Sequence, residues 1–199
     1  ATPVELSDEK QTVTLKSYGK ERIAYKIKGE NNEFLLLQNI QKGGWWTGVA
    51  SVYKTGMLVW RIDYNNEDVN LFDNPNNTLG KPKVMIVPAD GYVISDYNHG
   101  DGKQWTDDQY KESLQGDPFP GATNKSELLS VVLNNSTLEK PIYNIKEENG
   151  VITFDYLDNI SAIQLPSVDE TDITTKQIFS LDGRYLGNDA SKLTKGIYI

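Results

Sequence analysis

The strongest constraint on the fold is a series of short apolar segments separated by turn-forming residues. Residues 11–17 and 22–28 alternate polar and apolar side chains, as half-buried strands do. Residues 33–39 contain a continuous apolar run, which is typical of a strand buried on both faces. Residues 56–64 carry the strongest strand pattern of the sequence. The sequence therefore predicts a mainly β protein.

Later segments add a hairpin and a helix. Asn149-Gly150 separates two strand-like segments, 141–146 and 151–156, and this dipeptide is a strong hairpin signal. In residues 106–115 a capping threonine precedes two aspartates, and apolar residues follow at helical spacing. We expect an antiparallel β-sandwich or barrel-like sheet with one short helix at about residues 106–115 and a small C-terminal strand pair.

A change in composition after residue 158 predicts the domain organisation. Residues 159–176 are polar and acidic with little periodicity, which indicates a linker. Two strand-like segments follow at 177–181 and 196–199, and such a pair is too small to fold alone. We therefore predict a β-rich domain at residues 1–158, a linker, and a tail segment at residues 177–199.

Composition argues against several function classes. The 199 residues include no Cys and one His, His99, so thiolate chemistry is excluded and the two-histidine H-E-x-x-H zinc helix cannot form within this sequence. The formal charge is −8 with no basic patch, which argues against a nucleic-acid partner. A hydrolase based on His99 ranks lowest, because no G-x-S-x-G motif accompanies it.

The sequence shows no signal peptide at its start and no membrane-spanning segment. No apolar run approaches the ~20 residues that a membrane span needs, so no span is expected. The first residues lack the positively charged segment and the following apolar segment of a signal peptide. We interpret this as a signal peptide that was removed or as upstream sequence that is missing.

Three residues are candidates for ligand binding. Trp45 and Trp46 follow two glycines in an expected loop, where their rings could stack on a sugar or a peptide. We favour a competing interpretation, in which one of the two rings is a core residue that packs at the end of the sheet. Arg61 shares a strand face with Asp63, so either a mutual contact or a ligand-binding role would account for it.

Residues 96–102 have the oxygen-rich composition of a calcium loop, with Asp96, Asn98 and Asp101 as candidate ligands. Their spacing departs from the EF-hand, because Gly100 stands at the fifth position and no bidentate acid stands at the twelfth. A solvated turn is therefore favoured. Calcium is the one cofactor that the sequence suggests at all.

Several blocks resemble the region that follows the catalytic domain in immune-inhibitor-A-like secreted zinc metallopeptidases. Residues 33–41 (EFLLLQNIQ), the Gly-Trp at 44–45 and residues 56–65 (GMLVWRIDYN) resemble family patterns of the form E-Y-x-L-L-E-N-R-Q, G-W-D and G-[ML]-L-[VI]-[WY]-H-[IV]-D-Y-N. Similar blocks occur in order at residues 87–91, 116–121 and 140–154, so the resemblance covers about residues 1–157.

The departures fall on polar positions of these patterns. Gln38 stands where the family usually has Glu, Ile40 where it has Arg, Trp46 where it has Asp, and Arg61 where it has His. The family's zinc-binding helix belongs upstream of this region, so the resemblance assigns no catalytic residue to this chain.

The tail is similar to C-terminal segments of secreted Bacteroidetes proteins, some of which are sorting signals. The similar residues are 178–187 and 193–199. This resemblance implies a protein that is secreted, on the cell surface or periplasmic in a Gram-negative bacterium.

Two functions follow as hypotheses. The leading one is a non-catalytic accessory or substrate-positioning β-domain of an exported metallopeptidase-like protein, with an upstream protease domain or a protein substrate as its partner. The alternative is a free-standing surface module that binds glycans or peptides through exposed aromatics.

Overall fold

The computed structural model describes residues 2–64, 76, 78, 80–92, 105–159, 178–179 and 185–187. Contacts within the chain divide it into two compact units, Ala1–Ala162 and Ile163–Ile199. The predicted linker, apart from residue 159, lies outside the described residues.

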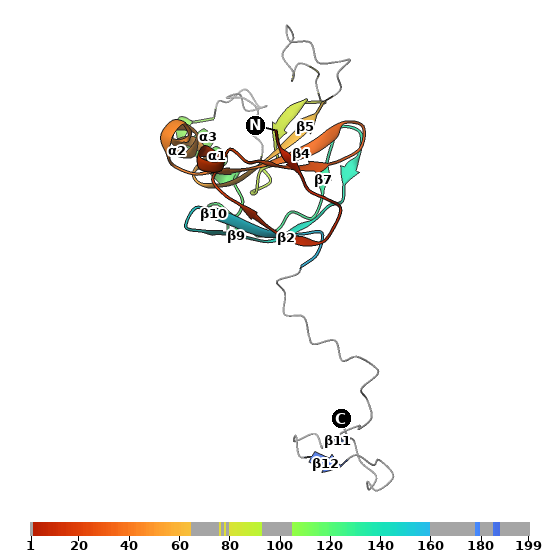
Figure 1. The fold of residues 1–199 in the computed structure, drawn as a ribbon. Coiled ribbons are helices and arrows are strands. Elements are labelled where there is room, and N and C mark those ends of the chain that lie inside the picture. Colours follow the sequence, from red (N-terminus) through yellow and green to blue (C-terminus); the bar gives the residue numbers. More distant parts are fainter. Residues whose placement is uncertain are drawn as a thin grey trace. The chain divides into compact units, whose positions relative to one another are not determined.

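The first unit contains a five-stranded sheet in the order β1-β3-β4-β5-β6 (Figure 1). β1 runs parallel to β3, and the other neighbours are antiparallel. The central pair is the longest, because its two apolar segments form eight consecutive residue pairs. The strands are β1 (Val4–Glu5), β3 (Tyr25–Lys28), β4 (Glu33–Ile40), β5 (Gly56–Asp63) and β6 (Val84–Ile86).

A three-stranded antiparallel sheet, β2-β10-β9, faces the first sheet. β9 (Ile142–Glu148) and β10 (Val151–Tyr156) form the predicted hairpin, and β2 (Gln11–Leu15) pairs with β10. Asn149 and Gly150 both have positive φ, 52° and 77°, as the tight turn between these strands requires. A separate pair, β7 (Val131–Val132) and β8 (Thr137–Leu138), lies at one end.

The main core lies between the two sheets. Alternate side chains of the central strands point inward, among them Leu35, Leu37 and Val59, and they meet apolar side chains of the second sheet such as Leu15 and Phe154. All five of these side chains are at most 1% exposed. The predicted mainly β, sandwich-like fold is confirmed.

Helices cover part of the outer face of the five-stranded sheet. The predicted helix is α3 (Asp107–Gly116), and Thr106 caps it in a capping box with Gln109. The structure adds α1 (Tyr18–Glu21), the 3₁₀ turn η1 (Gly44–Trp46) and α2 (Thr47–Tyr53), which the sequence did not predict. Ala50 of α2 packs on Leu58 and Ile40 in a second, smaller core.

In the second unit, β11 (Ile178–Phe179) pairs with β12 (Tyr185–Gly187) in antiparallel orientation. β11 lies where the sequence predicted the first strand of the tail. Its partner is an unpredicted segment, and residues 196–199 lie outside the described residues.

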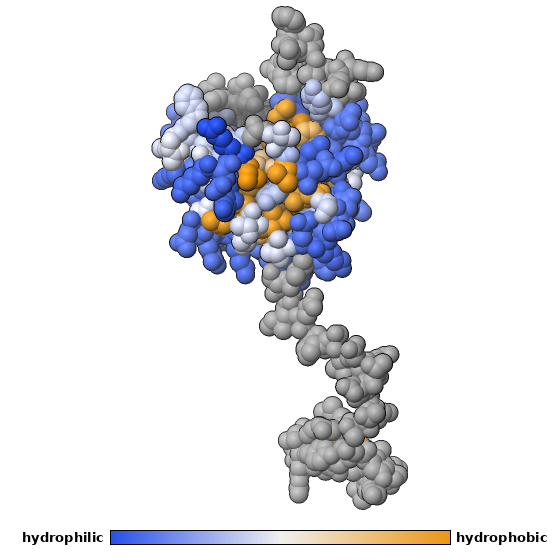
Figure 2. Space-filling model, in the orientation of Figure 1, coloured by the Kyte–Doolittle hydropathy of each residue, from blue (hydrophilic) through white to orange (hydrophobic). Residues whose placement is uncertain are grey.

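The surface seen in Figure 2 is mostly hydrophilic, with apolar side chains gathered near the middle of that face of the first unit. Of the helices that the structure describes, none combines the length and the apolar character that crossing a bilayer requires.

Candidate functional site

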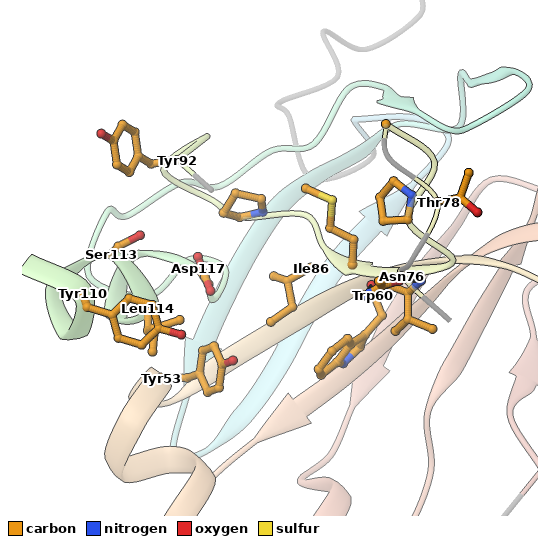
Figure 3. A pocket seen from close by; sticks show the side chains of 15 residues that line it. Tyr53, Trp60, Asn76, Thr78, Ile86, Tyr92, Tyr110, Ser113, Leu114 and Asp117 are labelled. Carbon is orange, nitrogen blue, oxygen red and sulfur yellow. Dashed lines mark hydrogen bonds between the residues drawn. The ribbon is translucent and has the colours of Figure 1, made fainter. Parts of the chain in front are cut away.

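A pocket of about 530 Å³ lies on the outer face of the five-stranded sheet (Figure 3). Trp60 and Ile86 are directly opposite each other on β5 and β6 and form part of its floor. Trp60 lies on this face because even-numbered residues of β5 point away from the main core. The described residues that line the pocket are Tyr53, Trp60, Asn76, Thr78, Gly80, Pro82, Val84, Met85, Ile86, Pro88, Tyr92, Tyr110, Ser113, Leu114 and Asp117.

The helices supply the aromatic side of the pocket. Tyr53 is the last residue of α2, and Tyr110 lies on α3 one turn before Leu114, so the spacing of the two α3 residues places them on one helix face. Figure 3 shows Tyr53, Tyr110 and Trp60 pointing into the same space. Burial, reinforced by the charges of Asp117 and Tyr110, raises the pKa of Tyr53.

One carboxylate belongs to the pocket lining. Asp117 directly follows α3 and is only 6% exposed. Burial, followed by the nearby charge of Asp90, raises the pKa of Asp117 from its ordinary value of 3.8 to about 7. Among the residues that the structure describes, none donates a hydrogen bond to this carboxylate, and the described lining contains no Lys, Arg or His.

Backbone contacts hold Asp90 next to the end of α3. Ala89 N donates to Asp117 O at 3.0 Å, and Asp90 N donates to Gly116 O at 3.2 Å. The Asp90 side chain in turn accepts a hydrogen bond from Tyr92 N at 2.8 Å. A Cβ at position 116 would collide with Asp90 Oδ2, so a larger residue there would displace the Asp90 side chain.

A second pocket of about 570 Å³ is lined in part by Trp45 and Trp46, the two tryptophans that the sequence suggested as ligand-binding residues. Trp45 is 92% exposed, whereas Trp46 is half-buried and meets Tyr18 edge-on, with ring centroids 5.1 Å apart. Trp46 also packs on the second core. The two rings therefore have different environments: Trp46 is a packing residue, and Trp45 is open to solvent. The basic residues of this pocket are Lys20, Arg22 and Lys42.

Arg61 is not among the described residues that line either pocket. Its guanidinium donates to Val132 O at 2.8 Å and to Asn134 Oδ1 at 3.2 Å. Asn134 Nδ2 then donates to Asp63 Oδ2 at 2.8 Å, so Asn134 bridges Arg61 and Asp63, the pair for which the sequence offered a mutual contact as one explanation. These contacts join β5 to the turn between β7 and β8.

The calcium candidates Asp96, Asn98 and Asp101, and also His99, lie outside the described residues. Within the described part of the chain, no three or more His, Cys, Asp or Glu side chains gather in a group that could hold a metal ion.

Two polar residues of the resemblance blocks join the sheets. Asn39 is fully buried, and its Nδ2 donates to Leu15 O at 2.8 Å and to Gly150 O at 3.0 Å. Gln41 Nε2 donates to Asn39 Oδ1 and to Glu147 Oε1, both at 2.9 Å. In this chain these residues tie β4 to the second sheet.

Sequence reasoning missed the Asp117 pocket. Tyr110 lies in the segment 106–115, for which the sequence predicted only a helix, and Tyr53 belongs to an unpredicted helix. Asp117 stands two residues after the predicted helix and within the resemblance block 116–121, but nothing in the sequence pattern placed it beside Trp60.

The fold and the site define a class: a β-sandwich-like protein with an aromatic pocket and one buried carboxylate on the outer face of its larger sheet. Comparison with protein-family models, with curated proteins and with solved structures gives no match.

Proposed function

We propose that this chain is a non-catalytic binding domain that holds a polypeptide substrate beside the catalytic domain of an exported metallopeptidase-like protein. The observation that carries the proposal is the Asp117 pocket, which combines half-buried aromatic side chains with a few polar groups, as binding pockets do. The resemblance of residues 1–157 to a post-catalytic region supports the link to a peptidase, and the tail supports export from a Gram-negative cell.

A binding experiment with matched variants tests the site. The full chain is applied to a peptide array and a glycan array, together with Tyr110→Ala and Tyr64→Ala. Tyr110 lines the pocket, whereas Tyr64 is 50% exposed and lies outside its lining. We expect peptide binding that Tyr110→Ala reduces and Tyr64→Ala leaves intact. Peptide binding that neither substitution changes would contradict the proposed site.

The link to a peptidase has a separate test. We expect the gene to encode an H-E-x-x-H helix immediately upstream of this region, because that motif supplies two zinc ligands and the general base. A gene without this motif upstream would contradict the peptidase link while leaving a binding role intact.

Trp45 favours a second candidate function, a surface module that binds glycans. Its ring is almost fully exposed beside a pocket that contains three basic residues, and exposed aromatic faces stack on sugars. In the same arrays, glycan binding that is lost in Trp45→Ala and retained in Tyr110→Ala would favour this candidate.

A further inference from the structure

We infer that the Asp117 pocket binds the basic side chain of a lysine or arginine in the polypeptide, with the ammonium or guanidinium group on the Asp117 carboxylate. This inference rests on the proposed function and names the class of side chain that the site selects. Buried carboxylates in folded proteins are normally paired or hydrogen-bonded. Asp117 as a whole residue is only 6% exposed, and no described residue donates a hydrogen bond to its carboxylate.

The remaining walls suit the rest of a basic side chain. Tyr53, Trp60 and Tyr110 offer aromatic faces, which attract cations and also pack against methylene groups. Figure 3 shows these rings around the same space as Asp117. Aromatic faces beside one carboxylate therefore select a group that is cationic at its tip and apolar along its stem.

The size and the charge of the pocket agree with this occupant. A volume of about 530 Å³ lies within the range of about 300–1,000 Å³ that is usual for ligand pockets, so a long side chain and part of its backbone fit. The described lining contains an acid and no base, and the whole chain carries a net charge of −8. Both features attract a basic ligand.

The charge of the ligand would change the protonation state of Asp117. Without a cation nearby, burial and the charge of Asp90 keep a large share of Asp117 protonated near neutral pH. A bound ammonium or guanidinium group would favour the ionised carboxylate and form a charge-assisted hydrogen bond with it. Binding would therefore release protons from Asp117. The number released follows from the binding enthalpies measured in buffers of different ionisation enthalpy.

Isothermal titration calorimetry on the full chain tests the inference. The probes are acetylated and amidated tripeptides with lysine, arginine or the neutral isostere norleucine at the centre, and free cadaverine. We expect the lysine and arginine peptides to bind at least about tenfold more tightly than the norleucine peptide, because the neutral side chain lacks the charge-assisted bond. This comparison needs no variant.

Two variants provide the structural control. Asp117→Asn keeps the shape of the side chain and removes its charge, and Glu139→Gln makes the same charge change at an exposed residue outside the pocket. We expect Asp117→Asn to weaken binding of the lysine peptide at least about tenfold and Glu139→Gln to leave it unchanged.

Each contrary outcome has a definite meaning. Equal affinity for the lysine and norleucine peptides, with binding still sensitive to Tyr110→Ala, would overturn the inferred selection for a basic side chain. The proposed peptide-binding function would then still stand. Tight binding of cadaverine with no binding of any peptide would show that the pocket takes a free amine, and would overturn the inference that the cation belongs to a polypeptide. Absence of saturable binding by every probe would overturn the inference and count against the proposed function.

Discussion

The carboxylate of Glu33 accepts a hydrogen bond of 2.6 Å from the backbone N–H of Asn134, a residue 101 positions further along the chain. The same carboxylate accepts bonds from Asn135 N and Ser136 Oγ, each at 3.2 Å. Glu33 is 1% exposed, so these donors replace its hydration. One buried acid on β4 therefore holds the turn between β7 and β8.

We predict that Glu33→Gln lowers the free energy of unfolding by about 1–3 kcal/mol, because the amide offers one acceptor oxygen where the carboxylate offers two. Urea denaturation of the variant beside Glu139→Gln measures the effect. Equal stability of the two variants would show that the turn does not depend on this carboxylate.

The two tryptophans provide a second prediction. Trp46→Ala should lower the free energy of unfolding by about 1–3 kcal/mol, because its ring packs on Tyr18 and on the second core. Trp45→Ala should change it by less than about 0.5 kcal/mol, because the ring is 92% exposed. Thermal and urea denaturation of both variants measure the difference. A large destabilisation by Trp45→Ala would assign Trp45 to the core and remove it as a binding candidate.

The elements that could be predicted are those whose signals are local. The strand patterns of β2, β4 and β5 and the Asn149-Gly150 turn depend on neighbouring residues, and Thr106 marks the start of α3 through its own capping bonds. α2 escaped prediction because Gly48, Val49 and Val52 are poor helix formers. Its stability comes from packing of Ala50 on Leu58, which sequence spacing does not reveal.

The pocket could not be predicted for the same reason. Tyr53, Trp60, Tyr110 and Asp117 come from four elements or loops that only the folded chain brings together. The sequence instead offered Trp45, Trp46 and Arg61 as candidates, with a packing role favoured for one tryptophan. In the structure Trp46 packs on the second core, Trp45 is 92% exposed, and Arg61 donates to Val132 O on β7. Local composition identifies aromatic residues and acids, but their convergence is a property of the tertiary fold.

Tyr156 provides a third prediction. Its side chain is fully buried, and no described residue forms a hydrogen bond with its hydroxyl group. Burial, followed by the charge of Asp8, raises the pKa of Tyr156 to about 12. Tyr156→Phe removes a buried polar atom while keeping the ring, so we expect stability to be unchanged or higher by about 1 kcal/mol. Urea denaturation tests this, and a loss of stability would reveal a hydrogen bond to the hydroxyl group.

Asp117 provides a prediction about pH. Its pKa is about 7 in the folded chain and 3.8 in its ordinary state, so between these values the folded chain binds more protons than the unfolded chain. The contribution of this group to stability is therefore present below about pH 4, falls as the pH rises towards 7, and stays constant above that. Asp117→Asn has no such titration, so its stability relative to that of the wild type should rise from pH 5 to about pH 7 and level off towards pH 8.

Urea denaturation at pH 5, 6, 7 and 8 measures this difference, with Glu139→Gln as the exposed control. Asp90→Asn adds a second check, because removal of its charge should lower the pKa of Asp117. NMR titration of the Asp117 carboxyl carbon in both proteins gives that value directly. Stability profiles of Asp117→Asn and the wild type that run parallel over this range would show that Asp117 is ionised in the folded chain, and the carboxylate would then need a cation that the described residues do not supply.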